Sequence, residues 1–259
     1  MGGWNCRHSY RPFFPGYEPA YSEDDLKEYT EKVCTYNGKE LTEYEASQQQ
    51  RCFERGIRRW KREYTAMDAA GLDTTQAAVK LKQWRAKEAD FLRQTGRRRD
   101  SSRSQIGTFG RSEAGKATWK FNKAVSEASE LFHSGSPAQK LAQYVKEKPI
   151  IDKLSSNGIK YIERISDTEL IVDAGTPTIR VMRQHAVQNL FEKSDRAEMT
   201  LEQAQNFVDN SKLTLYQQNR ETIKFLANDG YAVINFDHEL VTAVPQKWRK
   251  KYNKYIGGE

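Results

Sequence analysis

Residues 231–244 read YAVINFDHELVTAV, and this stretch decides the fold. Apolar and polar side chains alternate on both sides of Asp237 and His238, and alternation with a period of two is typical of β-strands. We expect a β-hairpin whose two-residue turn is formed by Asp237 and His238. The expected pairs, each with both members on one face, are Phe236 with Glu239, Ile234 with Val241, and Ala232 with Ala243.

Short segments with strand-like composition precede this hairpin. Helices are expected at 138–146, where Pro149 follows, and at 184–193 and 201–210, the last capped by Thr200. Residues 137–259 are therefore predicted to form a small domain of helices packed on an antiparallel sheet. The further strands are expected at 159–165, 169–172, 179–182, 213–217 and 222–227.

The first half of the chain has a helical period instead. Apolar side chains recur every three or four residues across 42–70 and 74–94, and a Gly turn joins the two segments, which predicts a helical hairpin. Shorter helices are expected at 22–33 and 116–132. Residues 95–115, between the expected helices at 74–94 and 116–132, are rich in Ser, Arg and Gly. This composition predicts either a linker or an arm that becomes ordered on a partner.

Three regions follow from these patterns, and together they give an α+β chain. Residues 1–21 are rich in Pro and aromatic side chains and are expected to be the end of a domain whose body precedes them. Residues 22–133 form the basic helical region, and the sequence HSGSP at 133–137 marks the boundary with the C-terminal domain.

The chain of 259 residues carries a formal net charge of +7, and the excess is concentrated between residues 51 and 103. Such a run attracts polyanions, DNA or RNA first, but acidic residues are interspersed, so an ordinary solvated helix face fits equally well. The candidate nucleic-acid-binding residues are Arg58, Arg59, Arg97, Arg98, Arg99 and Lys247.

Cysteine content and hydropathy exclude several classes of protein. The three cysteines lack CxxC spacing, which argues against a disulfide framework and fits a reducing compartment. Cys6 and His8 could form half of a zinc site, but no second pair accompanies them, so neither a metal nor a cofactor is expected. No apolar run reaches the roughly 20 residues that cross a bilayer, so no membrane partner is expected.

One face of the predicted sheet is polar and carries the candidate catalytic residues. Lys224 and Thr242 are expected on this face, with Tyr216 beside them if Leu213 and Leu215 point to the core. The set suits RNA cleavage without a metal: His185 as general acid or base, Lys224 stabilising transition-state charge, and Thr242 with Tyr216 orienting the phosphate. Each residue is also an ordinary structural residue for its position, so both interpretations stay open.

The N-terminal half resembles a known family. The motifs GWNCRHS at residue 3, PFFPG at 12, YEASQQQR at 44, ERGIRRWK at 54 and TFGR at 108 are similar to the C-terminal part of type 2 minor capsid proteins of tailed phages, in the MuF-like head-morphogenesis group. The resemblance implies a piece of such a protein, with capsid and portal proteins as partners. It also implies a location in the virion or the host cytoplasm.

Residues 137–259 resemble, less closely, the phage-associated nucleases of the barnase, EndoU, colicin and RelE class. The similarity lies in the order of two helices and four strands, with His185 opening the first helix and Thr242 in the last strand. The resemblance implies a metal-independent endoribonuclease or toxin acting on RNA, with a host or immunity protein as a further partner. The leading hypothesis is a minor capsid protein fragment whose basic helical region associates with the head or with packaged DNA and is fused to this endoribonuclease. The alternative is a non-enzymatic virion protein whose C-terminal domain docks a capsid, portal or host protein.

Overall fold

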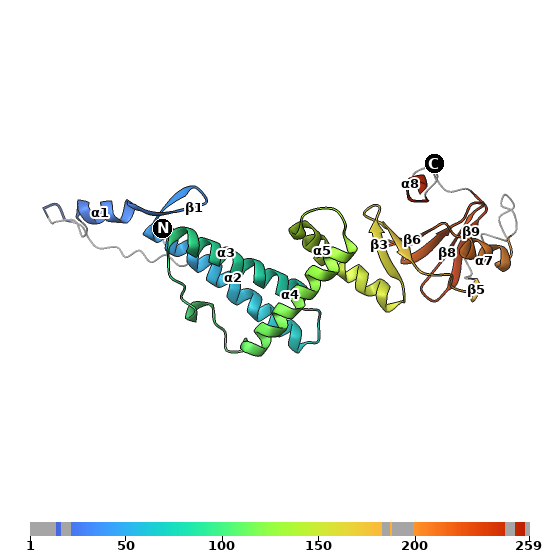
Figure 1. Ribbon diagram of the computed structural model, residues 1–259, viewed down its shortest axis with the longest axis horizontal. Helices are drawn as coiled ribbons and strands as arrows, with labels where there is room; N and C mark the ends of the chain where they lie inside the picture. Colours follow the sequence, from blue (N-terminus) through green and yellow to red (C-terminus); the bar gives the residue numbers. More distant parts are fainter. Residues whose placement is uncertain (1–13, 17–21, 183–186, 188–198, 247–251, 257–259) are drawn as a thin grey trace. The chain divides into compact units, whose positions relative to one another are not determined.

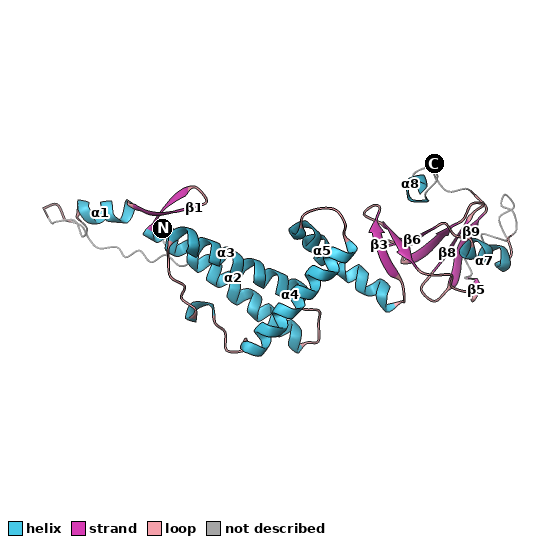
Figure 2. Ribbon diagram, viewed as in Figure 1, coloured by secondary structure: helices cyan, strands magenta, loops and turns pink. Residues whose placement is uncertain are grey.

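The computed structural model describes residues 14–16, 22–182, 187, 199–246 and 252–256. The chain divides into two compact units, residues 1–124 and residues 125–259. Helices make up most of the first unit, and most strands lie in the second (Figures 1 and 2). His185 and Lys247, two of the expected site residues, lie outside the described residues.

A pair of long helices forms the first unit, as the helical period predicts. Helix α2 spans Glu43–Ala69 and helix α3 spans Thr75–Thr95. The start of α2 is fixed by a capping box, in which the Thr42 hydroxyl accepts from the Glu45 amide and the Glu45 carboxylate accepts from the Thr42 amide. The buried side chains between the helices include Phe53, Ile57, Tyr64, Ala77, Leu81 and Phe91.

A β-hairpin before α2 was not expected from the sequence. Helix α1 is short, Glu23–Thr30, and is followed by strands β1, Lys32–Tyr36, and β2, Lys39–Thr42. The turn between the strands is at Asn37 and Gly38, both with positive φ. The ring of Tyr36 packs edge-on against Phe91, with 5.0 Å between centroids, so a tertiary contact holds this segment as a strand.

The expected flexible segment at 95–115 is folded back onto the helices instead. Backbone and side-chain contacts anchor it: Gln50 donates to the Arg98 carbonyl at 3.1 Å, and the ring of Phe109 is buried against Tyr64. It contains the short 3-10 helix η1, Ser102–Ser104, and ends where helix α4, Arg111–Leu131, begins. The prediction of a linker or a partner-dependent arm is wrong here because these internal contacts offset the chain entropy that the composition suggests.

The second unit contains a sheet of seven strands in the order β3-β4-β6-β7-β8-β9-β5. All neighbouring pairs are antiparallel except β5 with β9, which are parallel. The strands are β3, Lys160–Arg164; β4, Glu169–Asp173; β5, Val181–Met182; β6, Leu213–Gln217; β7, Thr222–Leu226; β8, Tyr231–Ile234; and β9, Glu239–Val244.

Next to its turn, the β8–β9 hairpin is shifted by one residue from the expected register. Ala232 pairs with Ala243 as predicted, but Ile234 pairs with Leu240 rather than with Val241. The loop has three residues because the Asn235 side chain accepts from the amides of Asp237 and Glu239 and because His238 adopts a φ of 63°. Val241 is the extra residue of β9 at this shift, so Leu240 lies opposite Ile234 and its side chain is fully buried in the core.

Three helices of the described part pack around this sheet. Helix α5, Pro137–Ser156, continues through Pro149, where the sequence predicted a stop. Its later residues are held by burial of Leu154 and by Lys153, whose ammonium lies 5.7 Å from the centroid of the Phe236 ring. Helix α7, Leu201–Asp209, packs against β7 and β8, and the short helix α8 spans Asn253–Ile256.

Candidate functional site

Lys224 and Thr242 share one face of the sheet, as expected. Lys224 is in register with Val233, and Val233 is in register with Thr242, so the three residues point the same way across β7, β8 and β9. We call this the lysine face. Both Lys224 and Thr242 are half-buried.

The lysine face is part of a hydrophobic core rather than an open polar surface. The buried Ile171, Leu213, Leu215 and Leu226 pack there with Tyr252, just before α8, and with Tyr255 and Ile256 of α8. Tyr252 is itself buried and donates a hydrogen bond to Glu169 at 2.7 Å. The ammonium of Lys224 lies 3.7 Å from the centroid of the Tyr231 ring. These contacts occupy much of the surface on which a phosphate was expected to bind.

Tyr216 lies on the opposite face, so its expected grouping with Lys224 is wrong. It is in register with Ile223 of β7 and Leu170 of β4, whereas Leu215 is in register with Lys224. Its ring packs on Phe236, with centroids 5.7 Å apart. Burial raises the pKa of the Tyr216 phenol. The prediction put Tyr216 on the wrong face because it assigned Leu213 and Leu215 to the face opposite Lys224, and both faces of the sheet are buried.

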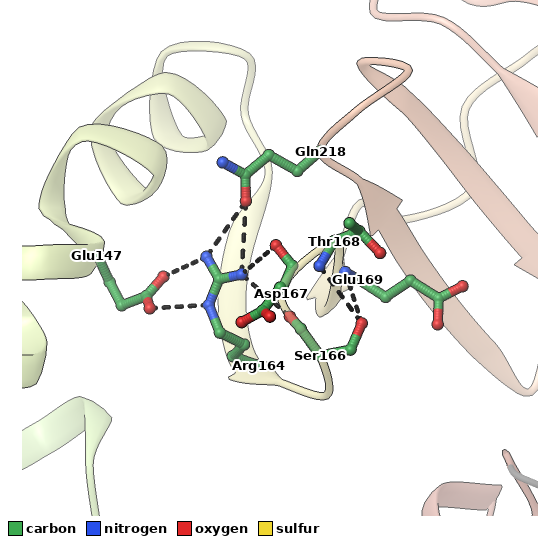
Figure 3. Close-up of polar contacts among 7 residues, drawn as sticks. All are labelled: Glu147, Arg164, Ser166, Asp167, Thr168, Glu169 and Gln218. Atoms are coloured by element: carbon green, nitrogen blue, oxygen red, sulfur yellow. Dashed lines mark hydrogen bonds and ion pairs between the residues drawn. The ribbon is translucent and has the colours of Figure 1, made fainter.

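An arginine at the end of β3 is the centre of a polar network in the second unit (Figure 3). Arg164 donates to both carboxylate oxygens of Glu147, at 2.8 and 2.6 Å, and Glu147 is 3% exposed. It also donates to the carbonyls of Ser166 and Asp167, both at 3.0 Å, and to Gln218. The hydrogen bonds with Glu147 raise the pKa of Arg164. One guanidinium thus joins α5, the β3–β4 turn and the turn after β6.

Tyr161, on the same strand, has a buried hydroxyl without a hydrogen-bond partner. The residue is 2% exposed and packs against Phe132, with 6.2 Å between ring centroids. Burial, helped by the negative charge of Glu147, raises the pKa of its phenol to about 12. A buried polar atom of this kind is uncommon in folded proteins.

In the first unit, most of the expected nucleic-acid-binding arginines are engaged within the chain. Arg97 is paired with Glu43 at 2.8 Å, Arg99 with Glu88 at 3.1 Å, and Arg59 with Glu63 at 3.2 Å. These pairs anchor the segment after α3 or lie along α2, and they leave less positive charge for a polyanion. Arg98 has an exposed side chain, and its carbonyl accepts from Gln50.

Other charges of the basic run are buried beneath that segment. Lys61 is 7% exposed and donates to the Ser104 carbonyl at 2.6 Å, and its burial lowers its pKa. Arg85 and Glu54 each have one buried side-chain atom without a hydrogen-bond partner. Burial raises the pKa of Glu54. Lys61 and Glu54 are buried and Arg85 is half-buried, so these residues present little of their charge to solvent.

A separate row of arginines lies along the solvent side of α2. Residues 51, 55, 58 and 62 are spaced by four, three and four, which at 100° per residue confines them to an arc of roughly 60°. Within the described part of the chain, no ion pair involves any of them. We call Arg51, Arg55, Arg58 and Arg62 the arginine stripe.

The side chains of the stripe are exposed or half-buried, and the buried side of α2, which includes Phe53 and Ile57, points away from it. The spacing is visible in the sequence, but only Arg58 was among the expected site residues. The sequence could not show which arginines are paired.

Comparison with known proteins identifies the N-terminal part. Residues 1–93 match the family model described as Phage minor capsid protein 2. Residues 1–93 belong to the phage minor capsid protein 2 family. The arginine stripe lies inside this matched segment.

For residues 1–93, the match supports a structural role in the phage. No curated protein and no solved structure matches the chain. The family match ends before the second unit, and the comparisons give no support to the nuclease resemblance of residues 137–259. No helix in the part that the structure describes has both the length and the apolar character needed to span a bilayer.

Proposed function

We propose that this phage minor capsid protein binds packaged duplex DNA through the arginine stripe of α2. The observation that carries the proposal is that four arginines share one helix face without an ion pair, while their neighbours Arg59, Arg97 and Arg99 are paired. The stripe extends roughly 16 Å along the helix, comparable with the major-groove width of about 12 Å. Contacts of this kind read phosphates and not base sequence.

The test is the salt dependence of binding to a fluorescent 20-base-pair duplex, measured by anisotropy on the full chain. Replacing Arg51, Arg55, Arg58 and Arg62 together by Gln removes up to four phosphate contacts. Each contact contributes about 0.9 to the slope of log affinity against log salt, so the slope should fall by roughly 3 to 4.

A matched control removes the same charge from the second unit. Arg180, Lys212, Arg220 and Lys146 are exposed, and replacing them by Gln leaves the stripe intact. The control should keep nearly the wild-type slope. Equal weakening in both variants would mean that net charge, and not the stripe, governs binding, and the proposal would be abandoned.

RNA cleavage by the second unit is the alternative activity, and one observation favours it: Lys224 and Thr242 share a sheet face. We place it second because Tyr216 lies on the other face and α8 packs on the lysine face. Incubating the protein with total RNA in EDTA, beside His185→Ala and Lys224→Ala, tests it. Cleavage by the wild type that both variants lose would establish it.

A further inference from the structure

The segment that follows α3 runs across one side of helix α2, where two side chains of α2 hold it. Gln50 donates to the Arg98 carbonyl at 3.1 Å, and the Lys61 ammonium donates to the Ser104 carbonyl at 2.6 Å. Glu54 lies between Gln50 and Lys61 along α2, and at 100° per residue the three side chains fall within an arc of roughly 40°. The segment therefore passes over Glu54.

Beneath this segment, Glu54 is a carboxylic acid without a cationic partner. The residue is 2% exposed, and its Oε1 atom has no hydrogen-bond partner. Glu88 differs, because its buried carboxylate pairs with Arg99 at 3.1 Å. In the part of the chain that the structure describes, no ion pair involves Glu54. Burial of an unpaired carboxylate is so costly that such a group takes up a proton instead.

The groups that face Glu54 come from α2, α3 and the segment itself. Gln50 of α2 hydrogen-bonds the carboxyl group, Glu88 approaches from α3, and the segment contributes Asp100 and Arg103. Burial raises the pKa of Glu54, and the positive charge of Arg103 opposes this rise. The negative charges of Glu88 and Asp100 add to it. Closure of the segment over Glu54 therefore favours the uncharged acid.

The segment is bounded by two glycines and is held by little apolar burial. Gly96 ends α3 with a φ of 68°, and a Cβ atom at Gly96 or at Gly107 would meet nothing within 4 Å. Of residues 97–105, which we call the latch, only Ser104 is buried, whereas Phe109 beyond Gly107 is buried in the core. Segments with few buried apolar contacts open at low cost. The latch can thus leave α2 while Phe109 stays in place.

We propose that the latch closes over the uncharged Glu54 carboxyl group and opens when that group loses its proton to water. Closure is strongest at and below the ordinary pKa of a glutamic acid and weakens as pH rises through the higher pKa of the closed state. Lys61 acts in the opposite sense, because burial lowers its pKa and loss of its proton at alkaline pH favours closure. Opening separates Arg99 from Glu88. The proposal concerns the first unit alone and does not rest on DNA binding.

Thiol labelling of the full chain measures the opening. Ser104 is 2% exposed, so the thiol of Ser104→Cys reacts when the latch is open, and Ser102→Cys, at an exposed position, is the reference. Both changes are made in a chain whose three native cysteines are replaced by Ala. The ratio of the two labelling rates should rise at least about fivefold from about pH 5 to about pH 8, since one titrating group changes an equilibrium up to about tenfold per pH unit.

Three further variants assign the pH dependence to one carboxyl group. Glu54→Gln cannot ionise, so its ratio should stay at the low acidic value throughout, and Glu54→Met, also uncharged, should behave alike. Glu63→Gln removes another carboxylate of α2, which pairs with Arg59, and is the matched control that should keep the rise. A ratio that does not change with pH while Glu54 is present overturns the proposal, and so does an equal rise in Glu54→Gln.

Discussion

Arg164 shows how one side chain sets the local geometry of the second unit. Its guanidinium has acceptors in three separate segments, and Glu147 is nearly fully buried. Lysine cannot reproduce this planar set of donors. The sequence shows an arginine at a strand end, but the partners lie 17 and 54 residues away, so only the fold brings them together.

Replacing Arg164 by Lys should lower the free energy of unfolding by about 2 to 4 kcal/mol, because the Glu147 carboxylate stays buried with fewer donors. Urea denaturation followed by circular dichroism measures the change. The double replacement Arg164→Met with Glu147→Met should be less destabilising than Arg164→Met alone, since it removes the unpaired charge. A double variant as unstable as the sum of the singles would refute the coupling.

Glu45 provides a pH-dependent contribution at the start of α2. The hydrogen bond from the Thr42 amide, followed by that from Lys32, lowers its pKa from 4.5 to about 2. A carboxylate whose folded pKa is lowered stabilises the fold above its ordinary pKa, and this stabilisation is lost as pH falls from about 4.5 to about 2.

The Tm of the wild type should therefore fall more steeply with decreasing pH than that of Glu45→Gln, with the difference largest above pH 4.5. Thermal unfolding in a series of buffers from neutral to acidic pH measures both curves. Glu40→Gln, an exposed change on β2, should run parallel to the wild type. Parallel curves for Glu45→Gln would show that the capping carboxylate carries no pH dependence.

At the scale of elements, the α2–α3 contact depends on a glycine inside a helix. A Cβ atom at Gly56 would lie 2.4 Å from the Trp84 ring, so the two helices approach too closely for any side chain. The helix pattern could be predicted from the apolar spacing, but the side on which Trp84 packs could not. The β1–β2 hairpin was missed for a similar reason, because its register depends on the contact of Tyr36 with Phe91.

Gly56→Ala should destabilise the first unit by roughly 1 to 2 kcal/mol, since overpacking against Trp84 exceeds the gain in helix propensity of about 1 kcal/mol. Gly115→Ala in α4 is the control. No atom lies within 4 Å of a Cβ built there, so this change should leave stability equal or raise it. Chemical denaturation compares the two, and a stabilised Gly56→Ala would contradict the close approach.

At the scale of the whole molecule, the described hydrophobic clusters stay within single units. Two clusters join residues of the first unit, including Phe53 and Tyr64, and a third joins β4, β6 and β7 to α8 in the second. Units with separate cores unfold separately when few contacts cross between them.

Calorimetry should therefore resolve two unfolding transitions. Gly56→Ala should shift one of them and Arg164→Lys the other, each leaving its counterpart unchanged. The two variants serve as controls for each other. A single transition shifted by both changes would show that the units are one cooperative structure.

The sequence by itself determined the class of the fold and the family of the N-terminal part. Helical spacing at 42–94, strand alternation after residue 159 and the motifs at residues 3 and 44 are local properties, and local properties can be read without tertiary contacts. The same reasoning placed Lys224 and Thr242 on one face, because alternation along a hairpin needs only the register of neighbouring strands.

The tertiary structure alone decided which charges and faces are available. Lys61 is buried while Arg55 and Arg62 of the arginine stripe are exposed, and the helix after residue 252 packs onto the face that carries Lys224. Tyr216 was misassigned because both faces of the sheet are apolar, and alternation cannot tell one buried face from another. The burial of a charge depends on segments distant in sequence, and these become neighbours only when the chain folds.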